Sequence, residues 1–402
     1  MSKEKLRVPK LRFPGFTEDW EQRKLIYIFN DFVVPMRDKP KVFSGTTPWT
    51  RIEDIEGRYI NTSLSGQFVS DETIKSMNLK VIPKGSLIVS ASATFGVVAI
   101  VNNDLITNQT FIGLVPNKDF DIDFLYSLFE APTTKGKLLK LSAGSTIFYI
   151  ARESFENLVL SVPSKEEQIK ISKVFKSIDD SITLHQRKLE HLNLKKKALL
   201  QKLFPKNGER YPELRFPGFT DAWEQRKLSE VVIINPKTEL PNEFKYVDLE
   251  SVVGTNLLGF QVIKKENAPS RAQRLASYGD VFYQTVRPYQ RNNYLFEDVD
   301  KDMVFSTGYA QLRSKLDSYF LLTLVQNDNF VKVVLDNCTG TSYPAINGSE
   351  LGKINVQIPS NEVEANQIGK VFRGIDKNIT LHQRKLEHLQ LQKKALLQQM
   401  FV

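Results

Sequence analysis

The stretch Leu-Arg-Phe-Pro-Gly-Phe-Thr occurs twice, at Leu11–Thr17 and at Leu214–Thr220, and each copy runs on to a tryptophan and then to Glu-Gln-Arg-Lys-Leu. A second duplicated stretch, Ile-Thr-Leu-His-Gln-Arg-Lys-Leu-Glu-His-Leu, occupies Ile182–Leu192 and Ile379–Leu389. The segments that lie between these copies are unlike each other. Internal repeats indicate the architecture of a whole chain, and this order predicts one framework that carries two different domains.

The composition is that of a globular protein. The chain has 402 residues, of which 41% are hydrophobic and 25% are charged, and this length suits two or three domains. A single cysteine, Cys338, excludes a framework of disulfides. No run of 18 apolar residues occurs, so no membrane-spanning helix is expected. We expect a cytoplasmic protein without a membrane partner.

The net charge of +9 is concentrated in two segments. Residues 164–204 hold 10 basic and 5 acidic side chains, and residues 360–402 hold 7 and 4. The rest of the chain is almost neutral. Residues 1–163 hold 20 basic and 18 acidic side chains, and residues 205–359 hold 18 basic and 19 acidic ones. A basic stripe indicates a polyanion or an acidic partner, although the solvated outer faces of two paired helices would give the same pattern.

Both basic segments show the spacing of long amphipathic helices. Apolar residues alternate at intervals of four and three, which predicts a coiled coil. The expected core residues are Ile171, Phe175, Ile178, Ile182, Leu189, Leu192, Leu199 and Leu203 in the first copy and Ile368, Phe372, Ile375, Ile379, Leu386, Leu389, Leu396 and Met400 in the second. Each helix would span roughly 50 Å. Its obvious partner is its duplicate, and a two-fold arrangement of the repeats favours antiparallel pairing.

The duplicated segment before each domain is expected to anchor the chain. Phe13, Phe16 and Trp20 lie on a path that proline and glycine make too irregular for a helix. The second copy follows the end of the first helix, and the first copy could meet the end of the second helix across space. The two repeats would then close a pseudo-two-fold ring.

The fold class follows from these patterns. Short apolar runs such as Leu87–Val89 and Val97–Val101 indicate strands, and Phe124–Glu130 and Tyr319–Gln326 indicate short helices. We expect an α+β protein with two mixed α/β domains, separated by two long helices that form an antiparallel coiled coil, in a pseudo-two-fold internal repeat. The expected boundaries are 1–163 for the first domain, 164–205 for the first helix, 206–359 for the second domain and 360–402 for the second helix.

The two domains place different polar residues in loops at equivalent positions. Arginine, asparagine and glutamine can bond bidentately to guanine or adenine edges, although polar loops also occur on plain surfaces. The candidate DNA contacts of the first domain are Ser90, Ser92, Thr94, Asn108, Gln109, Ser145 and Thr146. Those of the second domain are Gln284, Arg287, Tyr289, Gln290, Arg291, Asn292, Asn293, Thr307, Tyr309, Thr341 and Ser342.

The motifs of enzymes are missing from the sequence. No two glycines form a Gly-x-Gly arrangement, no Gly-Lys pair follows a phosphate-binding loop, and no Pro-Pro pair occurs. The four histidines lie in the expected helices without the spacing of metal ligands. We therefore expect no catalytic residue, no metal site and no cofactor in this chain.

The duplicated Leu-Arg-Phe-Pro-Gly-Phe stretch, the Gly-Ser/Thr loops and the matched helices together resemble the specificity subunits of type I restriction–modification systems, over the whole chain. The resemblance implies two target-recognition domains, each of which reads one half of a bipartite, asymmetric site on double-stranded DNA. It also implies that the helices set the spacer and dock two modification subunits, which methylate adenine at N6 with S-adenosylmethionine. Restriction subunits would add ATP- and Mg²⁺-dependent translocation and cleavage.

One other class of protein remains open from the residues alone. A stand-alone bipartite DNA-binding regulator would also have two unlike readers on one frame. It would bind its site tightly without a methyltransferase partner.

Overall fold

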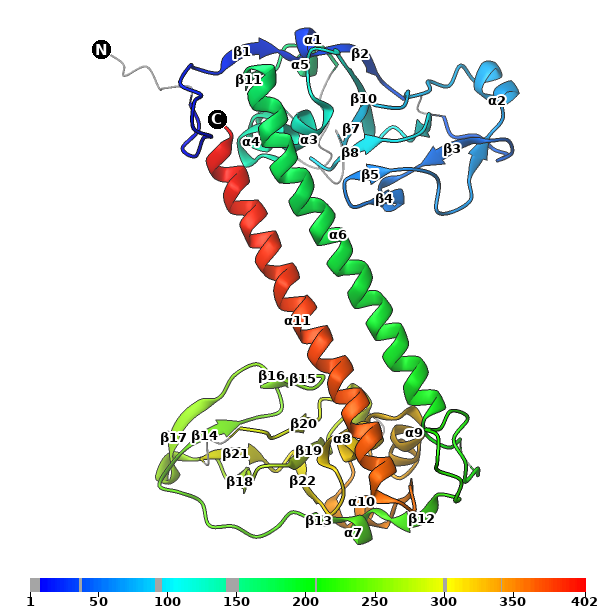
Figure 1. Ribbon diagram of the computed structural model, residues 1–402, viewed down its shortest axis with the longest axis vertical. Coiled ribbons are helices and arrows are strands. Elements are labelled where there is room, and N and C mark those ends of the chain that lie inside the picture. Colours follow the sequence, from blue (N-terminus) through cyan, green and yellow to red (C-terminus); the bar gives the residue numbers. More distant parts are fainter. Residues whose placement is uncertain are drawn as a thin grey trace. The chain divides into compact units, whose positions relative to one another are not determined.

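The chain divides into two units, which are described separately. The structure is a computed structural model that describes residues 8–35, 38–90, 96–141, 152–206, 208–298, 302–340 and 342–402. Unit 1 comprises Met1–Arg187 and Gln383–Val402, and unit 2 comprises Lys188–His382. Each unit thus contains one of the two unlike domains and a part of each long helix (Figure 1).

Unit 1 is built on a six-stranded sheet with the order β2-β10-β7-β8-β5-β4. All four residues of β7 and of β8 are buried, which explains why these strands appear in the sequence as continuous apolar runs. The strands are β2 (Phe29–Val33), β4 (Ile55–Glu56), β5 (Tyr59–Ile60), β7 (Leu87–Ser90), β8 (Val98–Val101) and β10 (Phe111–Pro116).

Unit 2 contains a sheet that is equivalent to four strands of this sheet, and we call the two equivalent four-stranded parts the framework sheets. Its four strands have the order β13-β22-β19-β20, which corresponds to β2-β10-β7-β8 in unit 1. The strands are β13 (Val232–Ile234), β19 (Asp280–Gln284), β20 (Tyr294–Leu295) and β22 (Tyr309–Ser314).

Each unit has a second sheet that contains one parallel pair, β3 with β9 in unit 1 and β14 with β21 in unit 2. The strands of unit 1 are β3 (Thr47–Thr50), β6 (Phe68–Val69) and β9 (Ile106–Thr107). Those of unit 2 are β14 (Glu243–Val247), β17 (Gln261–Lys264), β18 (Ala272–Leu275) and β21 (Met303–Ser306), with a separate hairpin of β15 (Val252–Val253) and β16 (Asn256–Leu257).

Short helices and two-stranded ribbons complete both units. The helices of unit 1 are α1 (Leu25–Ile28), η1 (Ile52–Asp54), α2 (Asp71–Ser76), α3 (Ile122–Glu130), α4 (Pro132–Leu141) and α5 (Arg152–Glu156). Those of unit 2 are α7 (Leu228–Val231), η2 (Lys265–Asn267), η3 (Pro288–Gln290), α8 (Ser318–Gln326), α9 (Asp328–Asp336) and α10 (Gly348–Lys353). The ribbons pair β1 (Glu21–Lys24) with β11 (Val159–Val162) and β12 (Glu224–Lys227) with β23 (Asn355–Ile358).

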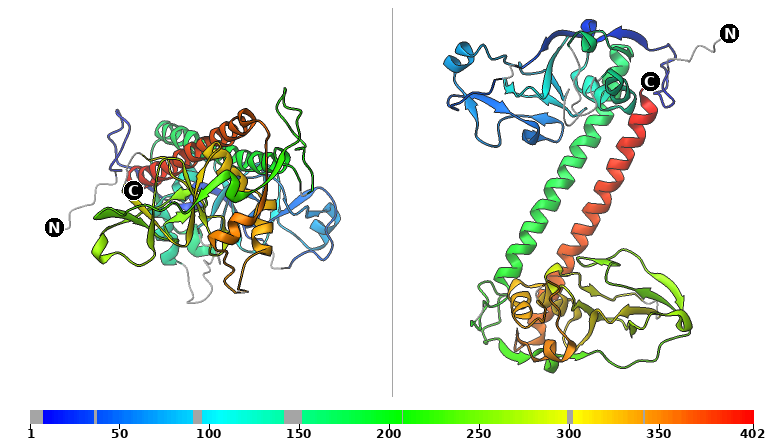
Figure 2. Two further views of the ribbon diagram at one scale, coloured as in Figure 1. Left: turned by 90° about the horizontal axis from the view of Figure 1, so that it is seen from below. Right: turned by 180° about the vertical axis from the view of Figure 1, so that it is seen from behind.

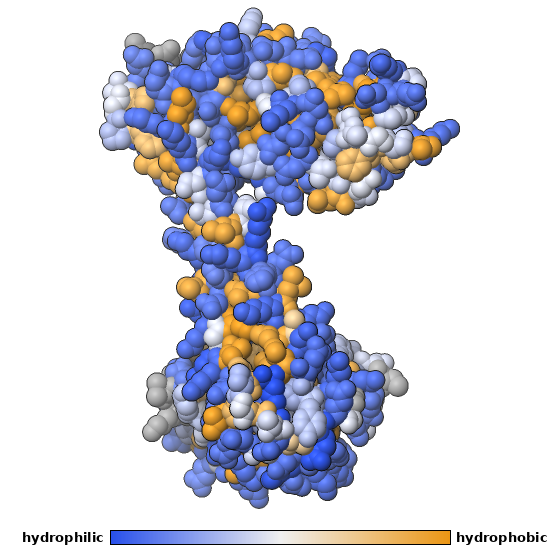
Figure 3. Space-filling view, turned by 45° about the vertical axis from the view of Figure 1, so that its right-hand side comes forward, coloured by the Kyte–Doolittle hydropathy of each residue, from blue (hydrophilic) through white to orange (hydrophobic). Residues whose placement is uncertain are grey.

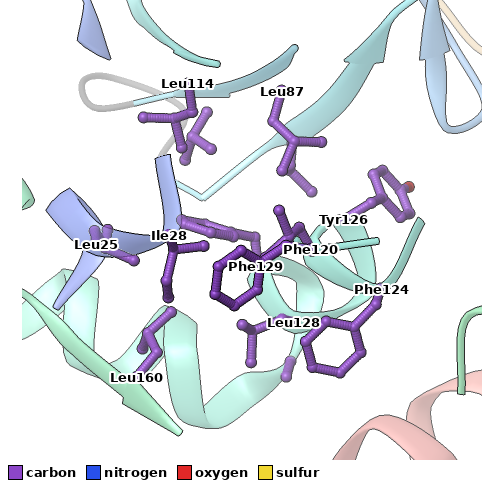
Figure 4. Packing of buried hydrophobic residues seen from close by; sticks show 14 of the residues in the cluster. Leu25, Ile28, Leu87, Leu114, Phe120, Phe124, Tyr126, Leu128, Phe129 and Leu160 are labelled. Carbon is purple, nitrogen blue, oxygen red and sulfur yellow. The ribbon is translucent and has the colours of Figure 1, made fainter. Parts of the chain in front are cut away.

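The helices α3 and α8 are equivalent and are buried against the sheets. Asp121 and Asp317 cap them, since each carboxylate accepts a hydrogen bond at 2.8 Å from the amide of the third residue that follows it. In unit 1, Phe124 and Phe129 on α3 are almost fully buried and pack in the same cluster as Leu87 of the sheet (Figure 4). Both helices were expected from the sequence, and both are confirmed.

The two long helices are present as expected. They are α6 (Lys165–Lys202) and α11 (Glu362–Met400), with 38 and 39 residues. The predicted core residues near the ends of the helices are buried, namely Ile171, Phe175, Ile178, Leu203, Ile368, Phe372, Ile375, Leu389 and Met400. The others are only half-buried, namely Ile182, Leu189, Leu192, Leu199, Ile379, Leu386 and Leu396. In a two-helix seam each side chain has one neighbouring helix, so water reaches it from the side.

The two helices are antiparallel within each unit, where their segments lie side by side (Figures 1 and 2). In unit 1, Lys393 of α11 contacts Asp179 of α6 at 2.6 Å. In unit 2 the roles are reversed, because Lys196 of α6 contacts Asp376 of α11 at 2.6 Å. The two lysines are equivalent in the repeat, as are the two aspartates, so the same ion pair occurs once in each unit, with the roles of the two helices exchanged.

The predicted closure of the repeat is confirmed by matching backbone contacts. The amide of Leu214 donates to the carbonyl of Lys202 at 2.8 Å, just after the end of α6. The amide of Leu11 donates to the carbonyl of Gln399 at 2.9 Å, at the end of α11. The first copy of the duplicated segment therefore docks on the end of α11, just as the second copy docks on the end of α6.

Aromatic side chains fasten both docking points. Trp20 and Trp223 are fully buried, and each meets a phenylalanine from a helix end edge to face. The ring centroids are 6.0 Å apart for Trp20 and Phe401 and 5.7 Å apart for Trp223 and Phe204. The expected anchoring role of the aromatic residues is therefore confirmed for the tryptophans.

An arginine in the same segment makes a second anchor, which the sequence did not suggest. The Nε and Nη2 atoms of Arg12 donate to the two carboxylate oxygens of Glu167 at 2.8 Å each. Arg215 makes the same bidentate pair with Glu364, also at 2.8 Å. Both glutamates are 1% exposed. The arginine of the duplicated stretch thus fixes each anchor segment to the start of a long helix.

A buried ion cluster ties the domain of unit 1 to its helices. Arg58 is 2% exposed and lies 2.9 Å from Asp123 and 3.6 Å from Asp179. Burial raises the pKa of Asp179, and Lys393 opposes this shift. In unit 2 a different contact occupies the equivalent place, since the hydroxyl of Tyr319 donates to Asp376 at 2.7 Å. The unlike domains therefore use unlike contacts to reach the same framework aspartate.

Candidate nucleic-acid interface

Two loops that are distant in sequence converge at one edge of the framework sheet of unit 2. The amide of Arg287 donates to the carbonyl of Pro344 at 2.8 Å, and the amide of Ile346 donates to the carbonyl of Thr285 at 3.0 Å. Val286 and Ala345 form an isolated β-bridge. The loop that follows β19 and the loop that follows α9 therefore form one surface, and both contain residues that the sequence proposed as DNA contacts.

The first of these loops has a strained backbone. Arg287 and Arg291 have φ angles of 54° and 55°, a left-handed conformation that costs a non-glycine residue on the order of 1–2 kcal/mol. The other non-glycine residues with positive φ among the described ones are asparagines, Asn78 and Asn235, which tolerate this conformation best. Strained residues of this kind concentrate at functional sites.

A polar network beneath the loop holds this conformation. The backbone amide of Gln284 donates a hydrogen bond to Asn293 Oδ1 at 2.8 Å, and Gln284 Nε2 donates to Gln290 Oε1 at 2.9 Å. The amide of Asn292 donates to Gln284 Oε1 at 3.3 Å. Gln284 and Asn293 are 2% and 1% exposed. Their assignment as DNA contacts is therefore corrected, because a buried side chain with partners inside the protein supports the loop and does not reach a base.

Tyr309 also differs from expectation. Tyr309 is fully buried between Phe282 and Phe305, with ring centroids 6.4 Å and 5.7 Å away. Burial raises the pKa of its phenol, so the hydroxyl stays protonated. Its assignment as a DNA contact is corrected to a core role. Thr307 is half-buried in the turn between β21 and β22, where its amide donates to Arg271 at 2.8 Å.

The exposed part of the converging loops contains the remaining candidates. Tyr289, Gln290 and Ser342 are exposed, whereas Arg287, Arg291 and Asn292 are half-buried. Asn292 accepts a hydrogen bond from the amide of Gly254 at 2.8 Å, which links the loop to the β15–β16 hairpin. Thr341 lies outside the described residues.

Tyr343 is a member of this surface that sequence reasoning missed. It is 63% exposed, and the guanidinium carbon of Arg287 lies 4.6 Å from the centre of its ring. Gly340 shapes the turn that presents it, because φ is +84° there and an added Cβ would lie 3.1 Å from the carbonyl oxygen of Tyr343. The signal in the sequence was an aromatic residue directly after the Gly-Thr-Ser stretch.

The candidate residues of unit 1 are described only in part. Ser90, at the end of β7, is 2% exposed, and its hydroxyl accepts a hydrogen bond from the amide of Val97 at 3.0 Å. It is therefore corrected from a DNA contact to a residue that shapes its loop. In the turn between β9 and β10, Asn108 is half-buried and Gln109 is exposed. Ser92, Thr94, Ser145 and Thr146 lie outside the described residues.

Within the described part of the chain, no group of three or more histidine, cysteine, aspartate or glutamate side chains is arranged to hold a metal ion. None of the described helices is both long and apolar enough to cross a membrane. What the converging loops offer is hydrogen-bond donors and acceptors on a rigid support. Such a surface can recognise a ligand by its pattern of polar groups.

Comparison with known proteins gives one consistent result. A sequence model described as the type I restriction modification DNA specificity domain matches residues 17–194. The type I restriction enzyme MjaVIII specificity subunit of Methanocaldococcus jannaschii is 23% identical over 410 residues, which cover 96% of this chain and 92% of that protein. The MjaIX specificity subunit of the same organism is 26% identical over 251 residues, and the match spans only 56% of that relative's length.

A solved structure has the same fold. The crystal structure of a type I restriction–modification S subunit from M. genitalium matches with a TM-score of 0.68 over 98% of this chain and 99% of the other, at 15% identity. A match over nearly the whole of both chains includes both domains and both long helices. The two-domain repeat is thus the architecture of a known group of proteins.

Proposed function

Because the chain belongs to the family of type I restriction–modification DNA specificity subunits, we propose that each of its two unlike domains reads one half of a bipartite site on double-stranded DNA. Specificity subunits are the non-catalytic components of their complexes. The observation that carries the proposal is the pair of equivalent framework sheets, β2-β10-β7-β8 and β13-β22-β19-β20, which end in unlike loops. Two equivalent sheets that carry different polar loops suit two domains that recognise different bases.

The reading surface of unit 2 supports this assignment physically. Its loops bring an arginine, a glutamine and exposed tyrosines to one surface, and such side chains bond to base edges or contact phosphates. The domains are nearly neutral, whereas the helices carry the excess positive charge. We infer that part of the phosphate affinity comes from the helices, since it depends on lysine and arginine.

The proposed reaction partners are two modification subunits and, with them, restriction subunits. The modification subunits would supply S-adenosylmethionine and methylate adenine at N6, and the restriction subunits would supply ATP- and Mg²⁺-dependent cleavage. The present chain would contribute the choice of site and the position of its partners on the DNA.

Expression of the chain with its modification subunit, in a host that lacks N6-methyladenine, tests the proposed function. Genome-wide mapping should find methylation at one bipartite motif, with two unlike half-sites and an unread gap of fixed length. The host that carries the modification subunit alone is the control, and it should show no such motif. Absence of specific methylation, together with tight specific DNA binding by the purified chain alone, would favour a stand-alone regulator.

Exposed leucines on the helices mark the surface proposed for the modification subunits. Leu184 and Leu381 are equivalent in the repeat, as are Leu194 and Leu391, and all four are more than half exposed. Apolar surface accordingly interrupts the hydrophilic surface along the helices (Figure 3). In unit 1, the Lys393–Asp179 contact places Leu391 within about three residues, or roughly 4.5 Å along the axis, of Leu184. Two equivalent surfaces favour two copies of one partner.

Replacing Leu184 and Leu391 together with glutamate is expected to abolish binding of one modification subunit and to spare the other. Each leucine contributes about 1.5–3 kcal/mol when it is fully buried, so the site should weaken at least tenfold. Native mass spectrometry should show one bound modification subunit in place of two. Replacing Leu194 and Leu381 together with glutamate should likewise leave one modification subunit bound. Leu64→Glu, at an exposed position outside the helices, should leave both bound. Two bound subunits in both helix variants would rule out this surface.

The helices are also proposed to set the unread gap. An insertion of four residues after Arg187, matched by one after the equivalent Arg384, should lengthen both helices by roughly 6 Å. This length corresponds to between one and two base pairs of DNA, so the mapped gap should grow by that amount while both half-sites stay the same. An insertion in one helix alone should impair methylation, because it shifts the Lys196–Asp376 and Lys393–Asp179 contacts out of register. An unchanged gap in the matched variant would contradict the proposal.

A further inference from the structure

The two strained arginines of the unit 2 loop have different surroundings. The guanidinium of Arg291 is held by two contacts. Its Nη2 lies 2.6 Å from Asp328, and its Nη1 donates to the carbonyl of Gln326 at 3.1 Å. Gln326 returns a hydrogen bond from Nε2 to the carbonyl of Arg291, also at 3.1 Å. The guanidinium of Arg291 is therefore occupied by the α8–α9 corner of its own unit.

Arg287 has no such partner. No carboxylate or carbonyl of the described residues accepts from its guanidinium, which lies instead over the exposed ring of Tyr343. Its backbone is fixed by the hydrogen bond to Pro344 and by the β-bridge beside it. Stacking on an aromatic ring holds a guanidinium without using its N–H groups. The donors of Arg287 are therefore oriented and still available to a ligand.

We propose that Arg287, held over Tyr343, reads a guanine in the half-site of unit 2 and that Arg291 is a positioning residue that keeps the loop in place. This inference rests on the proposed function and specifies the base that the loop recognises. A planar guanidinium with two parallel free N–H groups matches the N7 and O6 acceptors of guanine in the major groove. Glutamine and asparagine side chains favour adenine, but Gln284 and Asn293 are buried and form hydrogen bonds that hold the loop.

The backbone strain agrees with this division of roles. A left-handed arginine is unfavourable unless its surroundings enforce it, and two independent anchors enforce it here. Pro344 and Ala345 hold the Arg287 side of the loop, and Asp328 with Gln326 holds the Arg291 side. Among the described residues, no protein group accepts a hydrogen bond from the Arg287 guanidinium, which is stacked on Tyr343.

Methylation mapping of variants tests the inference. Arg287→Gln should lose the guanine requirement at one position of one half-site and slow methylation of the wild-type site about 10- to 100-fold, while the other half-site stays unchanged. Arg287→Lys should also lose it, because lysine has no planar fork. Tyr343→Ala should relax the same position by a smaller factor, and Tyr343→Phe should retain it. Arg291→Gln should lower methylation with the motif unchanged. Arg226→Gln, at an exposed position outside the loops, is the charge-matched control.

A base analogue gives an independent readout. Replacement of the mapped guanine with 7-deazaguanine removes the N7 acceptor, so wild-type binding should weaken about tenfold while Arg287→Gln should bind both DNAs equally. An unchanged motif and rate in both Arg287→Gln and Arg287→Lys would overturn the inference and leave the proposed function standing. A changed base preference in Arg291→Gln alone would also overturn it. Absence of specific methylation with the wild-type chain would reject the proposed function and this inference together.

Discussion

Replacement of Arg12 with alanine is expected to destabilise unit 1 by about 3–5 kcal/mol, because it leaves the carboxylate of Glu167 buried without its partner. Glu167 is 1% exposed, and its carboxylate accepts two hydrogen bonds from Arg12, each at 2.8 Å. Arg215→Ala should have the same effect on unit 2 through Glu364. Urea unfolding followed by hydrogen exchange should show both losses and assign each to its own unit.

Two controls separate this effect from a general loss of charge. Arg23→Ala removes an ion pair with Glu21 of the same length, 2.8 Å, but these side chains are 41% and 64% exposed, so the cost should stay below about 1 kcal/mol. The double variant Arg12→Met with Glu167→Met should regain most of the lost stability, because no unpaired charge remains buried. An Arg12→Ala variant as stable as Arg23→Ala would show that the anchor contributes little.

Phe401→Ala is expected to cost about 3–5 kcal/mol, the range for removing a buried phenylalanine side chain. Phe401 follows directly after the end of α11 (Glu362–Met400). Here its ring is 4% exposed and lies 6.0 Å from Trp20 and 5.6 Å from Phe175, centroid to centroid. The large cost is therefore a test of whether the end of the second repeat closes on the beginning of the first. Thermal or urea unfolding measures it.

The matched variant in unit 2 is Phe204→Ala. Phe204 meets Trp223 and Phe320 at 5.7 Å each, but it lies within the chain, where its neighbours are held in any case. Similar losses for both variants would support a closed repeat, in which the segment after α11 is held as firmly as the segment after α6. A loss below about 1 kcal/mol for Phe401→Ala alone would mean that the first and last segments are only loosely joined in solution.

The closure also explains why the anchor segment is short and nearly identical in both copies. Each copy joins a helix end through a tryptophan and the start of a helix through an arginine, so one segment of about ten residues contacts both long helices of its unit. Substitution at either position would disturb a buried neighbour.

The sequence by itself determined the repeat, the long helices and their pairing. The heptad spacing predicted helices at 164–205 and 360–402, and the structure has α6 and α11 there. Burial along a helix or strand recurs at a fixed interval, so it is visible in a local window. The two-fold order of the duplicated segments also sufficed to predict antiparallel helices and the docking of the first segment on the last helix.

Only the tertiary structure decided which polar residues face solvent. Gln284, Asn293 and Tyr309 had the same residue types as the exposed candidates, yet all three are buried. The role of Arg12 depends on Glu167, which is 155 residues away, and that of Arg287 on Tyr343 in another loop. A polar side chain is buried or exposed according to long-range contacts that satisfy its hydrogen bonds, and such contacts leave no periodic pattern in the sequence.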